Sequence, residues 1–338
     1  RQRQMCIRDR LKDEDNESIY CRTLLFATDN ELWIGTESGA YIYNLRTGKY
    51  THLRSSEYDP YSLSDNAIYS FCKDREDGIW IGSYFGGVNY YPRSYTHFEK
   101  YYPKGEENSL HGKRVREFCR DNYGVLWIGT EDGGLNRFDP KTKTFSFFAP
   151  SSGFTNIHGL CMVDDKLWVG TFSKGLKIVD TNTGNILKTY QKNDSPRSLI
   201  DNSIFAICRT TAGDIYLGTM FGLLRYNEQT DDFERITELI GRFVYDIKED
   251  SGGNLWLATY ANGAYCYNVN EKRWKNYVHN EGNQESLPYD KVLSIFEDSH
   301  RQIWLTTQGG GFCLFHPETE TFTSYNSSNG LPNDVVYQ

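Results

Sequence analysis

Residues 126–148 read LWIGTEDGGLNRFDPKTKTFSFF, and the first five of these residues have six copies or near copies elsewhere in the chain. Each copy holds an apolar residue, an aromatic residue, a second apolar residue, then Gly, Ala or Thr, and finally Thr or Ser. The copies are centred on Trp33, Trp80, Trp127, Trp168, Tyr216, Trp256 and Trp304. Successive centres lie 40 to 48 residues apart, which matches the length of one four-stranded propeller blade per copy.

Each copy divides into four short strands separated by polar turns. In the second copy we expect strands over residues 67–73, 78–83, 87–92 and 97–102. The turns between first and second strands hold Asp, Gly or Asn, which favour tight hairpins. Second strands are apolar on both faces, as expected when every sheet packs between two neighbours. The pattern predicts an all-β fold, a seven-bladed β-propeller of four-stranded antiparallel blades.

Composition agrees with this fold and excludes some classes of protein. Among 338 residues, Tyr 25, Phe 19, Trp 7 and Gly 30 stand against Pro 9 and Met 3, a composition typical of strands and turns. No run of 18 apolar residues occurs in the sequence, so this segment does not read as an integral membrane protein. The net charge of −8 comes without a Lys/Arg block, so we expect no nucleic-acid partner.

The repeats also divide the chain. Residues 1–10 (RQRQMCIRDR) share nothing with the repeats; residues 5–9 resemble translated sequencing-adapter sequence, and we exclude the segment from fold reasoning. We expect a lead-in over residues 11–20, seven blades over residues 21–328, and the start of a following blade or a closing strand over residues 329–338. These limits predict a fragment of a longer chain. One seven-bladed ring is favoured, with a fragment that straddles two rings as the alternative.

The repeated aromatic residue and the cysteines are interpreted as structural. A residue at the same place in every blade is expected to fill the space between blades. Without Cys6, seven cysteines remain, and neither CxxC nor CxxH spacing occurs. We therefore expect small buried hydrophobic residues, with no disulfide, no metal and no cofactor.

The ligand is predicted at one edge of the blades, which we call the variable edge. It consists of the connections between blades and the turns between second and third strands, at residues 37–38, 84–85, 131–132, 172–174, 220–221, 260–262 and 308–309. The connections range from residues 237–242 to residues 54–66, and variable loops on a rigid scaffold are where binding usually occurs. The opposite edge, which holds the other two turns of each blade, is called the hairpin edge.

Aromatic residues in these turns could stack on the apolar faces of sugars, and nearby cations could meet carboxylate or sulfate groups. The predicted ligand-binding residues are Tyr84, Phe85, Arg114, Phe172, Lys174, Phe221, Arg242 and Tyr260. Arg116 and Lys291 share the cationic character. Two alternatives stay open, that the aromatic residues cover a channel mouth or a second propeller, and that the charges are solvated or paired. Asn66 and Asn202 are expected to cap loops.

At these residues the chain resembles the two-component regulator propeller family, whose blades combine the LWIGT element, Gly-Gly, an aromatic-Asp-Pro turn and a Phe-rich fourth strand. Ser-Leu pairs at residues 62–63, 109–110, 198–199 and 286–287 strengthen the resemblance. It implies a ligand-sensing, periplasmic segment of an inner-membrane hybrid two-component sensor of the Bacteroidota type, with the histidine kinase outside this chain. The implied partners are an oligosaccharide, a second propeller and a β-sandwich of the parent chain, and a homodimer stays open.

Two other functional classes were weighed, a propeller enzyme acting on glycans (a lyase or glycosidase) and a protein-interaction scaffold. The Asp-x-x-Gly-x-x-Trp elements at residues 121–127 and 250–256 are only loosely similar to sialidase Asp-boxes. An enzyme needs paired carboxylates or a similar catalytic pair on one face, and the candidates are Glu37, Glu131, Asp132 and His158. We expect a non-catalytic segment; the scaffold is not distinguished by sequence.

Overall fold

The computed structural model describes residues 20–59, 61–93, 99–105, 107–148 and 153–336. The expectations for residues 1–10 and for residues 11–19 of the lead-in lie outside these ranges. The chain forms two compact units, residues 1–106 and residues 107–338, and each is described by itself.

The first unit holds two antiparallel sheets with strands in sequence order. The first sheet consists of β1 (Cys21–Thr28), β2 (Glu31–Thr36), β3 (Gly39–Asn44) and β4 (Tyr50–Leu53). The second consists of β5 (Ile68–Lys73), β6 (Ile79–Ser83) and β7 (Val88–Tyr91). The fourth strand expected over residues 97–102 is not found, because residues 99–102 have no strand pairing and the other two lie outside the described ranges.

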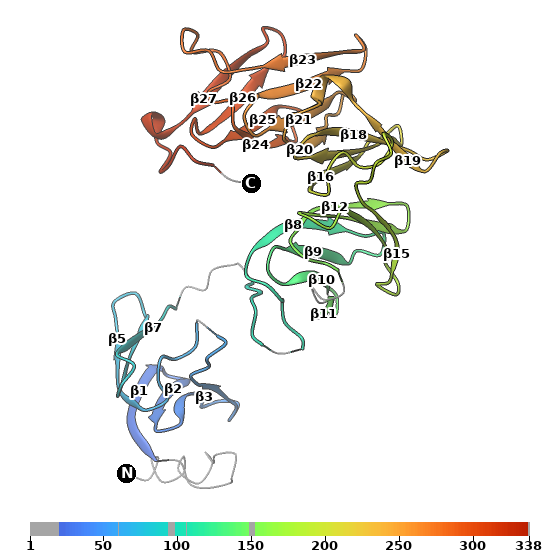
Figure 1. Ribbon diagram of the computed structural model, residues 1–338. Coiled ribbons are helices and arrows are strands. Elements are labelled where there is room, and N and C mark those ends of the chain that lie inside the picture. Colours follow the sequence, from blue (N-terminus) through green and yellow to red (C-terminus); the bar gives the residue numbers. More distant parts are fainter. Residues whose placement is uncertain (1–19, 60, 94–98, 106, 149–152, 337–338) are drawn as a thin grey trace. The chain divides into compact units, whose positions relative to one another are not determined.

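The second unit holds five four-stranded antiparallel sheets, again with neighbours in sequence order (Figure 1). Its first sheet holds β8 (Val115–Arg120), β9 (Leu126–Thr130), β10 (Gly134–Asp139) and β11 (Thr144–Phe148). The next sheet holds β12 (Ile157–Val163), β13 (Lys166–Thr171), β14 (Leu176–Asp180) and β15 (Ile186–Tyr190). The third holds β16 (Ile204–Arg209), β17 (Ile215–Thr219), β18 (Gly222–Asn227) and β19 (Asp232–Arg235). The last two are β20 (Val244–Glu249), β21 (Leu255–Thr259), β22 (Ala264–Asn268), β23 (Arg273–Tyr277); and β24 (Val292–Glu297), β25 (Ile303–Thr307), β26 (Phe312–His316), β27 (Thr321–Tyr325).

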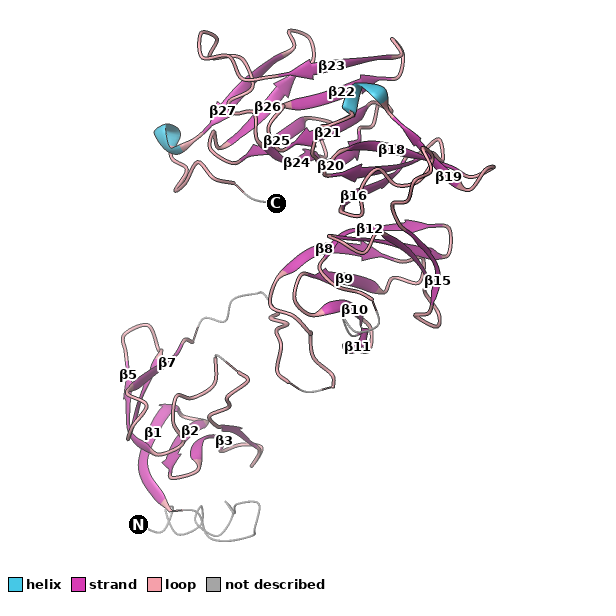
Figure 2. Cartoon of the chain, in the orientation of Figure 1, coloured by secondary structure: helices cyan, strands magenta, loops and turns pink. Residues whose placement is uncertain are grey.

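The fold is therefore all-β with seven blade sheets of the β-propeller type, as predicted. In the part of the chain that the structure describes, the helical elements are two short 3-10 turns, η2 (Thr237–Leu239) and η3 (Ser327–Asn329) (Figure 2). One sheet contributes three described strands where four were expected.

The small residue of the LWIGT element lets neighbouring sheets approach. A Cβ built on Gly129 of β9 would lie 2.5 Å from Cγ2 of Ile157, which begins the first strand of the next sheet. Gly35 faces Ile68 in the same way, and Gly170 faces Ile204. These isoleucines are fully buried, so a β-branched residue on one sheet fills the space left by glycine on the sheet before it.

The final Thr of the element closes the turn into the third strand. Its hydroxyl donates to the carbonyl of the glycine that opens or precedes that strand, with distances of 2.6 to 2.9 Å, at Thr36, Thr130, Thr171, Thr219, Thr259 and Thr307. All six threonines are fully buried. The hydroxyl thus gives the glycine carbonyl a side-chain donor, and in three sheets the same carbonyl, of Gly175, Gly263 or Gly311, also accepts the backbone N–H of the Thr.

The repeated aromatic residue is buried in most copies, as expected. Trp33, Trp127, Trp168 and Trp256 are buried, whereas Tyr216 and Trp304 are partly buried. Trp80 is 45% exposed; it belongs to the second sheet of the first unit, after which that unit adds no further sheet. The interpretation as inter-sheet packing holds for the buried copies and not for Trp80.

All seven cysteines from Cys21 onward are free. Cys266 and Cys313 are buried, and Cys119, Cys161 and Cys208 are partly buried. Cys21 and Cys72 are exposed, so the prediction of small buried hydrophobic residues is wrong for these two.

The start of several repeats is fixed by a polar side chain. Asn66 and Asn202 each accept a backbone N–H at 2.7 Å, from Ser55 and Lys192, which lie two residues after the last strand of the preceding sheet. They cap loops, as expected. Asp334 takes the same place after the last sheet: its carboxylate accepts the N–H of Ser327, and its carbonyl accepts the N–H of Gly311 at 2.8 Å.

Candidate functional site

Every blade sheet carries a β-bulge at the same place. Pairing between the first and second strands skips the second residue of the first strand in all seven sheets. The bulge residues are Arg22, Tyr69, Arg116, His158, Phe205, Tyr245 and Leu293. Bulges re-aim side chains and are frequent next to functional sites. The geometry of this position is repeated whereas its chemistry changes from sheet to sheet.

In the second unit, bulge residues from four different sheets form a closed circuit of contacts. Arg116 donates from one guanidinium nitrogen to the Tyr245 hydroxyl at 2.7 Å and to His158 Nδ1 at 3.2 Å. The rings of His158 and Phe205 lie 4.7 Å apart, and those of Phe205 and Tyr245 lie 5.7 Å apart. The four side chains therefore hold each other in place.

Residues of the variable edge extend this circuit. Phe172 lies 5.8 Å from His158 and 6.0 Å from Phe205, and Phe243 lies 4.5 Å from Phe205. Tyr260 stacks on Phe243 at 5.2 Å and carries the Lys291 ammonium 3.5 Å above its ring centre. We call the whole set the rim cluster: Arg116, His158, Phe172, Phe205, Phe243, Tyr245, Tyr260 and Lys291.

Burial and hydrogen bonding keep His158 neutral. It is 8% exposed, and burial, together with the positive charge of Arg116, lowers the pKa of its imidazole to about 4. Since Nδ1 accepts from Arg116, Nε2 carries the proton and donates to Asn156 Oδ1 at 2.9 Å. His158 is therefore a positioning group and not a cation at neutral pH.

The carboxylates near the rim cluster are already engaged. One carboxylate oxygen of Glu131 lies 3.6 Å from a guanidinium nitrogen of Arg114, and the other lies 3.5 Å from Nε of Arg116. Asp132 accepts the backbone N–H groups of Lys113 and Arg114 at 3.0 and 3.1 Å. In the first unit Glu37 pairs with Arg22. The carboxylates nominated for catalysis thus have structural partners, and they do not form an acid/base pair among themselves in either unit as described.

One carboxyl next to the rim cluster is strongly perturbed. Burial raises the pKa of Glu117, the neighbour of Arg116 in β8, to about 7, with a smaller contribution from the charge of Asp246. Asp246 itself accepts Ser294 Oγ at 3.0 Å and the Ile295 N–H at 2.9 Å. Glu117 therefore titrates near neutral pH.

The predicted site residues separate into three groups. Phe172 and Tyr260 belong to the rim cluster, and Arg114 lies beside it through their shared partner Glu131. Lys174, Phe221 and Arg242 lie at the variable edge of the same unit, outside the rim cluster; Phe221 is 50% exposed. Tyr84 and Phe85 belong to the first unit, where Tyr84 stacks on Tyr69 at 5.1 Å and meets Phe85 at 4.3 Å.

The sequence reading overlooked Phe205, Phe243 and Tyr245. Their signal is positional: Phe205 and Tyr245 each lie eleven residues before the central aromatic residue of their LWIGT element, as Arg116 does, whereas His158 lies ten residues before its own. Comparing this column across the repeats, with a shift of one residue in the fourth copy, would have found all the bulge residues.

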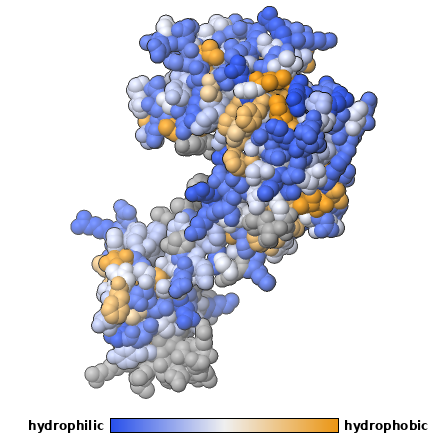
Figure 3. Space-filling model, in the orientation of Figure 1, coloured by the Kyte–Doolittle hydropathy of each residue, from blue (hydrophilic) through white to orange (hydrophobic). Residues whose placement is uncertain are grey.

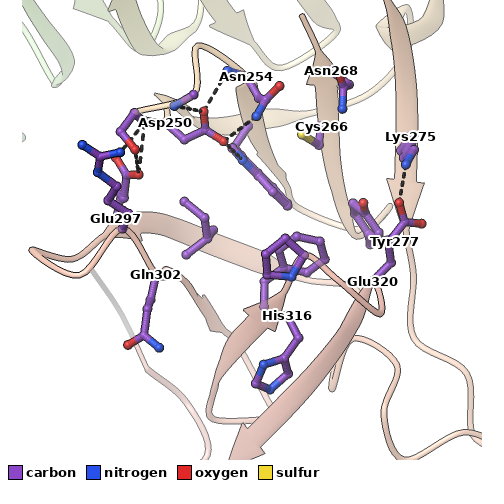
Figure 4. A pocket seen from close by; sticks show the side chains of 17 residues that line it. Asp250, Asn254, Cys266, Asn268, Lys275, Tyr277, Glu297, Gln302, His316 and Glu320 are labelled. Atoms are coloured by element: carbon purple, nitrogen blue, oxygen red, sulfur yellow. Dashed lines mark hydrogen bonds and ion pairs between the residues drawn. The ribbon is translucent and has the colours of Figure 1, made fainter. Parts of the chain in front are cut away.

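A separate pocket of about 340 Å³ lies at the hairpin edge, between the sheets β20–β23 and β24–β27. Figure 4 shows Asp250 hydrogen-bonded to Asn254 and the Lys275 ammonium joined to Glu320. Lys188 and Asp231 form the same pair two sheets earlier. Because this ion pair repeats between equivalent strands and turns, it stabilises the packing of neighbouring sheets. In the described residues, no group of three or more His, Cys, Asp or Glu could hold a metal ion.

Comparison with known families agrees with this arrangement. The model of the family described as two component regulator propeller matches residues 62–85, 109–132 and 238–261. Each match covers the connection before a first strand, the bulge, the LWIGT-type element and the following turn. The chain carries two component regulator propeller repeats. In this propeller chain the three matched segments include copies from both units.

Proteins similar to the propeller chain include bacterial regulators that are longer than it is. Histidine kinase P4 of Formosa agariphila is 28% identical over 179 residues, which are 50% of this chain and 12% of that protein. The extracellular domain of BT4673 from B. thetaiotaomicron, described as a one component system, superposes with a TM-score of 0.52 at 18% identity and covers 93% of this chain and 49% of that one. The extracellular domain of BT3049 from B. thetaiotaomicron, described as a hybrid two component system, superposes with a TM-score of 0.49 at 22% identity. It covers 96% of this chain and 49% of that one.

The propeller chain therefore spans about half of the length of these extracellular domains. At 18% identity the likeness to BT4673 concerns the fold. Within the ranges that the structure describes, there is no helix both long and apolar enough to cross a membrane.

Proposed function

We propose that this chain is the ligand-sensing propeller region of a membrane-anchored two-component sensor. It lies in the periplasm, detects an oligosaccharide and signals to a histidine kinase outside this chain, and the segment itself is non-catalytic. A second propeller and a β-sandwich of the same parent chain, and a second copy of the protein, are the proposed protein partners. Similarity to a histidine kinase and to extracellular domains of bacterial regulators supports this proposal.

The observation that carries the proposal is the contrast between two columns of the repeat. The Thr that closes each turn is retained in six sheets and is buried in all of them. The bulge residue is Arg, Tyr, Arg, His, Phe, Tyr and Leu in succession. A scaffold that repeats its structural contacts while the chemistry of one column varies is suited to recognising a ligand at the edge that carries this column. His158, Phe205 and Leu293 of the column are themselves buried, so they shape this edge from beneath.

Aromatic side chains at this edge supply the chemistry for a sugar. Phe172 is 39% exposed and Tyr260 is 37% exposed, although both pack against other side chains of the rim cluster. Such rings offer apolar surface at low cost in conformational entropy. The proposed contacts are those predicted from sequence, Tyr84, Phe85, Arg114, Phe172, Lys174, Phe221, Arg242 and Tyr260, joined by the rim cluster.

The test is calorimetric titration of the chain with a panel of neutral, uronic-acid and sulfated oligosaccharides, with chromatography of the sugars after incubation. We expect saturable binding of at least one oligosaccharide, with no change in its length. Phe172→Ala and Tyr260→Ala should each weaken binding about tenfold or more, since contact aromatics often account for more than 1 kcal/mol.

Tyr123→Ala is the matched control. Tyr123 is 65% exposed in the turn between β8 and β9, at the hairpin edge, so its loss should leave affinity unchanged. Cleavage of the sugar would favour the enzyme, and failure of every oligosaccharide to bind would overturn the proposal. Unchanged affinity in both rim variants would refute the location of the site.

A further inference from the structure

We infer that the oligosaccharide bound at the rim cluster is anionic, and that Lys291 is the side chain that binds its carboxylate or sulfate group, with Arg242 beside it. This inference rests on the proposed function and specifies its ligand class. It is carried by an imbalance of charge at the variable edge of the second unit.

Lys291 is held in place without an acidic partner. Its ammonium lies 3.5 Å above the centre of the Tyr260 ring, and its backbone carbonyl accepts the N–H of Gln308 at 2.9 Å. Among the described residues, no carboxylate lies within 4.0 Å of this ammonium. A cation fixed over an aromatic ring keeps its hydrogen-bond donors available, because the ring uses only its electrostatic attraction.

Two further cations at this edge also lack an acidic partner among the described residues. Neither the Arg242 guanidinium nor the Lys174 ammonium has an ion-pair partner in the ranges described. Arg242 immediately precedes Phe243, the ring that stacks on Tyr260. Arg242 and Lys291 thus lie just before the first strands of two consecutive sheets, β20 and β24.

Three carboxylates of this edge are committed elsewhere. Glu131 is paired with Arg114 and Arg116, and Asp132 accepts two backbone N–H groups. Asp290, the neighbour of Lys291, accepts the N–H of His279 at 2.6 Å. The three cations named above thus keep unpaired positive charge at one edge of a chain whose net charge is −8, and positive charge at this place favours an anionic ligand.

The aromatic row selects the class of anion. Phe172 contacts Phe205, Phe205 contacts Phe243, and Phe243 stacks on Tyr260, so that these rings form a row across three sheets. Such a row suits a ligand with several apolar faces in succession. Figure 3 shows that apolar surface in this unit occurs as limited patches within hydrophilic surface. A polyanionic nucleic acid is disfavoured by the overall negative charge, so a sugar acid or sugar sulfate is the ligand that fits both features.

The experiment uses three probes: an oligogalacturonide, its neutral methyl ester with the same sugar backbone, and a chondroitin sulfate oligosaccharide as a sulfated probe of different backbone. Calorimetric titration of the unmodified chain should show binding of one charged probe, weakened by added salt, and at least tenfold weaker binding of the methyl ester. Lys291→Gln should weaken the charged probe about tenfold to a hundredfold, the range for loss of a charge-assisted hydrogen bond, and Lys291→Arg should restore most of it.

Lys141→Gln, in the exposed turn between β10 and β11, removes one positive charge at the hairpin edge and should change nothing. Thermal melting of each variant checks that the fold is retained. Equal affinity for the ester and the acid, or an unaffected Lys291→Gln variant, would overturn the inference and leave the proposed function standing. If a neutral oligosaccharide binds and neither charged probe does, the inference is also wrong; if no oligosaccharide binds, the proposed function itself fails.

Discussion

Asp121 accepts the indole N–H of Trp127 on one carboxylate oxygen, at 3.1 Å, and binds the turn before it with the other. That second oxygen accepts the backbone N–H groups of Tyr123 and Val125, both at 2.9 Å. The same arrangement joins Asp74 to Trp80, Asp250 to Trp256 and Asp298 to Trp304. The Asp six residues before the Trp thus fixes the hairpin and the indole together, both where the fourth residue of the turn is Gly, as in residues 121–127 and 250–256, and where it is Asp77 or Arg301.

Replacing Asp121 tests this role. Asp121→Ala leaves the buried indole N–H and the turn N–H groups without an acceptor, so we expect the free energy of unfolding to fall by about 2 to 4 kcal/mol. Asp121→Asn keeps an acceptor oxygen and should cost less. Asp74→Ala is the matched control, because Trp80 is 45% exposed and water can replace the lost acceptor. Urea denaturation of the three variants gives the comparison; equal losses at both sites would contradict it.

Gly129 provides a second test, of packing between sheets. In Gly129→Ala the new Cβ would meet Ile157 Cγ2 at 2.5 Å, and overpacking of this kind costs about 1 to 3 kcal/mol. The double variant Gly129→Ala/Ile157→Ala should lose less stability than the sum of the single variants, because the second change relieves the clash. Strict additivity in denaturation experiments would show that the two residues do not pack against each other.

The repeat made most of the fold predictable. A motif that recurs every 40 to 48 residues fixes strand number, order and turn placement, because each copy must form the same sheet. The lack of strand pairing at residues 99–102 had no copy-specific signal, since the aromatic residues of segment 97–102 (HFEKYY) resemble those of the other fourth strands. The sequence also does not indicate that Cys72 and Trp80 are exposed, because their burial depends on whether another sheet packs against the sheet that holds them.

The site was only partly predictable for a related reason. Phe172 and Tyr260 stood out because aromatic residues in turns are unusual. Phe205 and Tyr245 lie inside strands, where aromatic residues are ordinary, and nothing in the local sequence indicates a bulge. Their place in the rim cluster becomes visible only when the register shift is known.

Glu117 predicts a loss of stability on the alkaline side. Burial raises its pKa to about 7 in the folded chain, against 4.5 for the exposed group. Between these values the folded state binds more protons than the unfolded state, so the free energy of unfolding falls with rising pH by about 1.4 kcal/mol per unit. Glu117→Gln should be more stable than the unmodified chain at pH 8 and equal to it near pH 4. Denaturation midpoints across this range provide the measurement, and parallel curves would contradict the burial argument.

His158 predicts the opposite slope on the acid side. Its pKa of about 4 lies below the ordinary 6.5, so between these values the unfolded state binds more protons and stability rises with pH. From about pH 4.5 to 6.5 the two slopes oppose each other, and the unmodified chain should show little net change from this pair. His158→Gln keeps an acceptor for Arg116 and removes only the imidazole titration, so the stability of this variant should fall with rising pH over that window.

NMR titration of His158 locates its pKa directly. In Arg116→Gln the pKa of His158 should rise, since a repelling charge is removed, but stay below 6.5 because burial persists. A value near 6.5 in the unmodified chain would mean that the circuit of His158, Arg116 and Tyr245 is open to water.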